Sequence, residues 1–270
     1  MILLEIGQIF IYSSYALMTQ SLIFTSDYIF PGLMTALIAS LGTFLLTKAI
    51  AVSPLSSVIP FLAFLPFFTM IFGTVLLGEK ISLIQFFGLI LLVLASLLIN
   101  YQGKKVNSIK ELFSVLYADL THEKGCILVI LTSLSWAIAI PFDKIATATV
   151  NPVSHALFHA ILCGIIFSVA RFFSKTSPWG TSVFLLESSV SNGLANIGLI
   201  LLGSLNASLA MVLQFTAYQG SYVGLVEAGK RAVSLIANLF LGAFLFKEAV
   251  NKFKILGTLL ILIATVLLLK

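Results

Sequence analysis

Apolar runs long enough to cross a lipid bilayer follow one another along almost the whole sequence. A helix of about 20 apolar residues spans the hydrocarbon of a bilayer. Only 9% of the residues are charged and 60% are hydrophobic, whereas about a quarter of the residues of a soluble domain are charged. The expected spans are approximately 2–23, 32–52, 55–78, 82–101, 125–142, 153–173, 195–219, 222–246 and 253–269. The sequence therefore predicts an all-α polytopic membrane protein with about nine transmembrane helices, in a range of eight to ten.

The basic residues gather between these runs. The net charge is +5, with 15 Lys and Arg in all. Positive charge in the loops is typical of membrane orientation, and it gives no reason to expect a nucleic-acid partner. We therefore expect the lipid bilayer as the surroundings of an integral multi-pass protein. The sequence does not determine an oligomeric state.

Two segments of the chain carry the same pattern. The first begins AVSPLSSVIPFLAFLPFFTMIFGTVLLGEK and the second begins GSYVGLVEAGKRAVSLIANLFLGAFLFKE. Aligned without a gap, they match Gly73 with Gly242, Glu79 with Glu248 and Gly88 with Gly257. Such a duplication is typical of many secondary transporters, in which the two copies are inverted relative to each other.

The duplication predicts two repeats, 1–101 with four spans and 125–270 with five, joined by a connecting segment at 102–124. Because two copies of one unit should have equal numbers of helices, we expect the first repeat to lack one helix. The first run has no basic start and no small-residue cleavage site, so we read it as a retained helix. An amphipathic piece around 109–120 and a short interfacial helix within 174–192 are expected outside the spans.

The repeated corner resembles the EamA-type repeat of the drug/metabolite transporter superfamily. In that repeat one helix ends near Ser-Pro, the next contains a proline, and a Gly-Glu corner precedes a helix that opens with Gly. The matching positions here are Ser53-Pro54, Pro60, Gly78-Glu79 and Gly88. In the second copy, the segment 226–231 (VEAGKR) is similar to one found in a bacterial subgroup, although Gly229 stands where a proline would align with Pro60.

The resemblance implies ten helices in two inverted five-helix copies around a central cavity, in a bacterial-type cytoplasmic membrane. It also implies secondary transport of small polar metabolites by alternating access. Amino acids or related compounds, moved outward, are the expected substrates, and nucleotide sugars or multidrug substrates are alternatives. A membrane-embedded enzyme or a non-transporting partner subunit is the rival interpretation. Because no catalytic set and no phosphate-binding loop emerge from the sequence, we expect neither an enzyme nor a cofactor.

Three charged residues in the penultimate span form the main candidate site. Glu227, Lys230 and Arg231 are spaced i, i+3 and i+4, which places them on one helical face. They could bind a zwitterionic or charged metabolite, and Glu227 could also take up the proton of a proton-coupled cycle. The alternative is a salt bridge inside the helix bundle, near the membrane surface.

The remaining candidates are polar or helix-bending residues within the spans. Gln214 and Tyr218 could line a cavity or belong to an interfacial aromatic belt. Trp136 needs a partner for its indole N–H near mid-span, whereas Asp143 and Lys144 are expected at the water boundary. Helix kinks are expected at Pro60, Pro66 and Pro141.

His155 and His159 stand four residues apart, which is a metal-ligand spacing. No acidic residue follows the first histidine and no third ligand is near in the sequence, so we expect no metal site. The two histidines could serve in a proton relay or a cavity, or they could simply pack as polar residues between helices.

Overall fold

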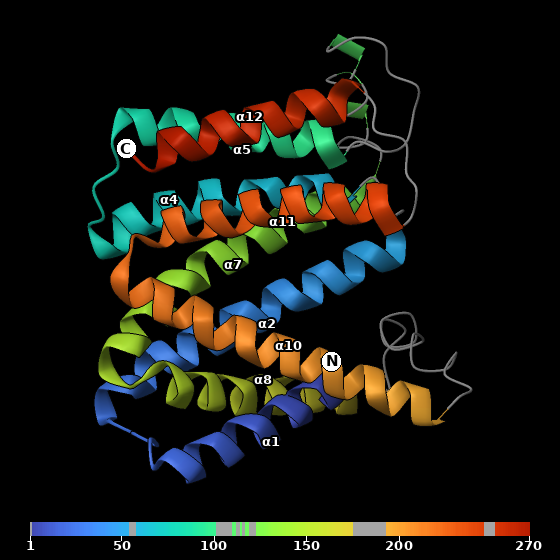
Figure 1. Ribbon diagram of the computed structural model, residues 1–270. Helices are drawn as coiled ribbons and strands as arrows, with labels where there is room; N and C mark the ends of the chain where they lie inside the picture. The colour runs from blue at the N-terminus through green and yellow to red at the C-terminus, as the bar shows by residue number, and fades with distance from the viewer. Residues whose placement is uncertain are drawn as a thin grey trace. The chain divides into compact units, whose positions relative to one another are not determined.

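The computed structural model describes residues 2–53, 58–100, 110–111, 114, 117–118, 123–174, 193–245 and 252–270. These residues form nine α-helices and two short 3-10 helices, without a strand among them (Figure 1). In chain order the elements are α1 (Ile2–Thr19), η1 (Ser26–Tyr28), α2 (Ile29–Val52), η2 (Ile59–Ala63), α4 (Phe64–Leu77), α5 (Leu83–Asn100), α7 (Lys124–Thr149), α8 (Pro152–Ser174), α10 (Gly193–Gly220), α11 (Val223–Leu245) and α12 (Lys252–Leu268). Most of the expected amphipathic piece at 109–120 and the expected helix within 174–192 lie outside the described residues.

Six helical segments of the described chain are long and apolar enough to cross a membrane. Helices α5 and α12 are apolar but shorter, and α11 carries the three charges of the candidate site. The prediction of an all-α polytopic membrane protein is confirmed. Two boundaries differ clearly: α7 was expected to end at residue 142 but continues to Thr149, and α4 begins at Phe64, after η2, within a span expected from residue 55.

Helix ends are set by the residues that the local sequence supplies. Ser82 and Gln85 form a capping box at the start of α5: the Ser82 hydroxyl accepts from the Gln85 N–H at 3.2 Å, and the Gln85 side chain accepts from the Ser82 N–H at 3.1 Å. Asn151 caps α8 by accepting the Ser154 N–H at 2.8 Å, and Pro152 occupies the first helical position, where its missing N–H has no cost. Gly78 ends α4 with a φ of 67°, which glycine adopts without strain.

The described residues form two compact units. Unit 1 contains Met1–Leu41 and Ile138–Ser221, and unit 2 contains Gly42–Ala137 and Tyr222–Lys270. Helices α2 and α7 each pass through both. Each unit therefore combines helices from both sequence repeats.

Unit 2 has an apolar core built on α5 and α12, which lie side by side (Figure 1). A Cβ atom on Gly88 would lie 3.2 Å from the Ala264 carbonyl oxygen, and one on Gly257 would lie 3.1 Å from the Ala95 carbonyl oxygen. Gly88 and Gly257 are equivalent in the repeat alignment, as are Ala95 and Ala264. The two contacts are thus the same contact made twice by antiparallel helices, as inverted repeats require.

Unit 1 also buries polar side chains between its helices. Here α1 packs against α8 and α10, and many of the residues between the helices are polar. The buried polar residues of this unit are Gln8, Thr35, Ser40, Asp143, Thr147, Ser154, His155, His159, Ser204 and Ser208. A bilayer offers no water to such groups, so they must find partners within the protein or in what it binds.

Candidate functional site

Four buried side chains of unit 1, which we call the Asp143 cluster, are joined by hydrogen bonds: Tyr28, Thr35, Asp143 and His155. His155 Nε2 lies 3.1 Å from Asp143 Oδ1, and Tyr28 Oη lies 3.0 Å from His155 Nδ1. The Thr35 hydroxyl donates to the same Asp143 Oδ1. Exposure is 0% for Thr35 and His155, 3% for Tyr28 and 6% for Asp143, so the cluster is shielded from solvent.

The turn between α7 and α8 brings Asp143 and His155 together. Helix α7 continues for two turns beyond Pro141, and the Asn151 cap then starts α8 in the opposite direction. The Asn151 amide also donates to the Ser21 carbonyl, and the Ser154 hydroxyl accepts the Ile23 N–H at 2.9 Å. These bonds fix the chain that leads into α2 against the start of α8, and so hold Tyr28 beside His155.

The hydrogen-bond pattern assigns roles to the ring nitrogens of a neutral His155. If Nε2–H donates to the Asp143 carboxylate, Nδ1 accepts from the Tyr28 hydroxyl. When the ring is protonated, both nitrogens donate and Tyr28 becomes the acceptor. The same geometry therefore accommodates the pair before and after it gains a proton.

Further polar side chains follow His155 along one face of α8. His159 comes one turn later, with its ring centroid 6.0 Å from that of His155, and Cys163 lies another turn on. The Cys163 sulfur is 3.7 Å from each ring nitrogen of His159 and accepts the Ser40 hydroxyl at 3.5 Å. In the residues that the structure describes, no three His, Cys, Asp or Glu side chains are grouped so as to hold a metal ion.

Tyr218 and Gln214 belong to the same unit, on α10. Tyr218 is fully buried, and its ring centroid is 6.4 Å from that of Phe215, which in turn lies 4.3 Å from the His155 ring. Gln214 is half-buried. Burial of Tyr218 does not fit an interfacial belt, in which the hydroxyl would face the membrane surface.

The charged residues of α11 lie in unit 2. The Lys230 ammonium donates to Glu227 Oε1 at 2.6 Å, and the Glu227 side chain is 4% exposed while that of Lys230 is 44% exposed. Arg231 donates from Nε and Nη2 to the Ser96 hydroxyl of α5, at 3.2 and 2.8 Å. The three residues share a face as expected, but Lys230 pairs with Glu227 whereas Arg231 contacts Ser96.

Trp136 is half-buried in unit 2 and packs closely on α2. A Cβ atom added to Gly42 would lie 2.6 Å from Trp136 Cδ1 and 2.7 Å from its Nε1, so only glycine leaves room for the indole. Of the three prolines, Pro141 lies inside α7. Pro60 belongs to the 3-10 helix η2, and Pro66 lies in the first turn of α4, where a missing N–H breaks no helical bond.

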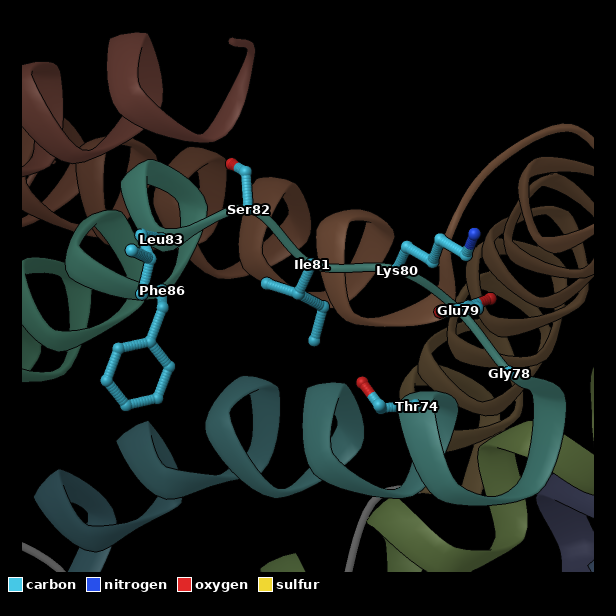
Figure 2. Close-up of a pocket in the computed structure, with 8 residues that line it drawn as sticks. All are labelled: Thr74, Gly78, Glu79, Lys80, Ile81, Ser82, Leu83 and Phe86. Atoms are coloured by element: carbon cyan, nitrogen blue, oxygen red, sulfur yellow. The ribbon is translucent and has the colours of Figure 1, made fainter.

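The corner between α4 and α5 holds an open pocket of about 540 Å³. Figure 2 shows Phe86 extending from α5 toward α4, with Thr74 and the segment from Gly78 to Ser82 around the same space. The buried carboxylate of Glu79 accepts the Val223 N–H at 3.0 Å with each oxygen. Glu79 thus caps the start of α11.

Asp143 was expected at the water boundary; the structure places it within α7, with 6% of its surface exposed. The proline at 141 and the charged pair that follows suggested the end of a helix, but proline is tolerated inside membrane helices whose neighbours satisfy the backbone. Tyr28 was not among the residues predicted for the site. Its position next to a Pro-Gly segment gives no signal in the sequence for a contact with a histidine 127 residues away.

Comparison with known protein families agrees with this architecture. A model of the EamA-like transporter family matches residues 3–101 and 123–270. The search of curated proteins gives no match. The two matched segments contain all nine α-helices named above, and the family consists of membrane transporters. The chain therefore belongs to the EamA-like transporter family and is a membrane transporter of the drug/metabolite type.

Proposed function

We propose that this protein exports a small polar metabolite, an amino acid or a related compound, by alternating access. The observation that carries the proposal is the burial of carboxylates inside apolar helices, Asp143 in unit 1 and Glu227, paired with Lys230, in unit 2. Ionisable groups buried at membrane depth are costly and mark substrate or ion pathways.

The charges of α11 favour a substrate with both an amino and a carboxylate group. Glu227 can receive an ammonium group, while Lys230 and Arg231 can receive a carboxylate. The exposed Lys230 ammonium can leave Glu227 with little loss of solvation and make room for a ligand. A lipophilic cation would use only half of this charge pattern.

The proposed cycle uses the inverted repeats. Two related halves can exchange equivalent contacts between an inward-open and an outward-open state. The outward direction rests on the family resemblance alone. We further propose that a proton drives the cycle, for which the buried carboxylates Glu227 and Asp143 are the candidate carriers.

Thermal unfolding of the purified protein tests the substrate class. A ligand that binds only the folded state at about 100 times its Kd stabilises that state by ~2.7 kcal/mol. We expect amino acids to raise Tm, and sugars or nucleotide sugars to leave it unchanged. Lys230→Ala should lose the shift, while Lys80→Ala, which alters an exposed lysine elsewhere in unit 2, should keep it. An amino-acid shift that survives in Lys230→Ala would move the site away from α11, and shifts produced only by sugars would refute the substrate class.

A further inference from the structure

Asp143 is a buried carboxylate without a strong cation beside it. Among the described residues its ion-pair partner is His155, and no lysine or arginine is paired with it. The neighbouring Lys144 donates its ammonium to the Ser221 carbonyl at 2.8 Å instead. The partner of Asp143 is therefore an imidazole, a group that can hold one proton or two.

One oxygen of Asp143 remains open. The bonds from Thr35 and His155 both end on Oδ1, and Oδ2 takes no hydrogen bond from the part of the chain that the structure describes. The side chain keeps 8% of its surface exposed. A proton can bind Oδ2 while Oδ1 keeps both of its donors, so loading the cluster breaks no existing bond.

Glu227 offers a different environment. Its Oε1 accepts the Lys230 ammonium at 2.6 Å, so a cation of the chain already lies against this carboxylate. Binding an amine is therefore a better use of Glu227, and carrying a proton is a better use of Asp143.

We propose that Asp143 and His155, oriented by Thr35 and Tyr28, form the proton-binding site that couples transport to a proton gradient. The coupling role rests on the proposed transport function, whereas proton binding by the pair does not. A proton from water adds to the pair, which passes from a net charge of −1 to neutral, and the same proton leaves to water when the site faces the other side.

Other titratable groups surround this site and are expected to modulate it. They are Lys144 on α7, Tyr28 before α2, His159 and Cys163 on α8, Tyr218 on α10, and Glu5 and Tyr12 on α1. Sodium is a less suitable occupant than a proton. A hard cation prefers a full shell of oxygen ligands, and His155 offers a ring nitrogen in place of an oxygen.

Selective labelling can read the proton directly, since the chain has only three aspartates and three histidines. We would record NMR spectra of the full-length protein, labelled with ¹³C at the aspartate carboxyl and ¹⁵N in the histidine ring, between about pH 5 and 8. Signals missing in Asp143→Asn and His155→Gln identify the pair. We expect the two signals to move together through one transition, and the His155 transition to change in Asp143→Asn. Asp27→Asn, a matched change at an exposed aspartate of unit 1, should leave it unchanged.

Proteoliposomes then separate proton coupling from substrate binding. With a mixture of radiolabelled amino acids as the probe, Asp143→Asn should keep exchange at equal pH and lose accumulation driven by a pH gradient. Glu227→Gln should lose both. Tyr28→Phe, which removes only the bond to His155 Nδ1, should weaken accumulation but not exchange.

Three results would overturn the proposal: signals of Asp143 and His155 that do not change with pH, a His155 transition unaffected by Asp143→Asn, or gradient-driven accumulation that survives in Asp143→Asn. Sodium-dependent shifts at constant pH would assign the site to that ion instead. If the wild-type protein exchanges no amino acid, the proposed substrate class fails, while the NMR titration still decides whether the pair binds a proton.

Discussion

Two glycines on the same helix should respond in opposite ways to the same substitution. Gly224 and Gly229 both lie in α11, five residues apart. A Cβ atom on Gly224 would lie 2.8 Å from both Cα and Cβ of Met70 in α4, whereas a Cβ atom on Gly229 would meet nothing within 4 Å. Alanine at 224 therefore forces a methyl group against Cα and Cβ of Met70, and alanine at 229 enters open space.

The magnitudes follow from two opposing effects. Overpacking costs ~1–3 kcal/mol, and replacing a helical glycine by alanine gains up to ~1 kcal/mol. We expect Gly224→Ala to destabilise the protein by ~1–2 kcal/mol, and Gly229→Ala to be neutral or to stabilise it by up to ~1 kcal/mol. For a chain of this size a change of 1 kcal/mol moves Tm by roughly 2–4 °C.

Thermal unfolding in one detergent, at one protein concentration, measures both variants against the wild-type protein. The difference between the two variants matters more than either value, because detergent affects them equally. Equal Tm values for Gly224→Ala and Gly229→Ala would refute the close approach of α4 and α11. A more stable Gly224→Ala would also contradict it.

Three further changes test other contacts by the same unfolding measurement. Ser82→Ala should cost ~0.5–2 kcal/mol because it removes the cap of α5, while Ser168→Ala, at an exposed serine within α8, should change Tm little; equal effects would contradict the capping box. Glu79→Gln keeps an oxygen for the Val223 N–H and should lose only the charge at the start of α11, ~0.3–1 kcal/mol, whereas Glu79→Ala leaves that N–H unpaired and should cost ~1–3 kcal/mol; the reverse order would show that Glu79 does not cap α11. Gly42→Ala should displace the Trp136 ring and change its fluorescence, and an unchanged spectrum would refute that packing.

The helices of this protein could be predicted from sequence because each coincides with an apolar run, and several of these runs are bounded by glycine, proline or asparagine. The span expected from residue 153 begins at Pro152, directly after the Asn151 cap. The end of α7 was placed too early, because a proline and two charges resemble a helix end when the neighbouring helices are unknown. A bilayer segment can continue past such residues once tertiary contacts satisfy them.

The candidate site was only partly predictable. The pairing of Glu227 with Lys230 follows from helical spacing, which the sequence displays directly. The Asp143 cluster depends on the contact of α7 and α8 with the start of α2, where Tyr28 and Thr35 are more than 100 residues away from their partners. Spacing along a single helix carries no information on such contacts. His155 could be singled out as polar and unusual, but its partners could not be named.

The reciprocal glycine contacts of α5 and α12 mean that these helices present nearly the same surface to each other. A surface that fits its own inverted copy needs only one helix sequence to form a pair. The interface therefore does not require the two repeats to differ in sequence. An ancestral chain with a single repeat could have formed it between two identical subunits inserted in opposite directions. Fusion into one chain would then have converted an interface between two identical subunits into an intramolecular contact.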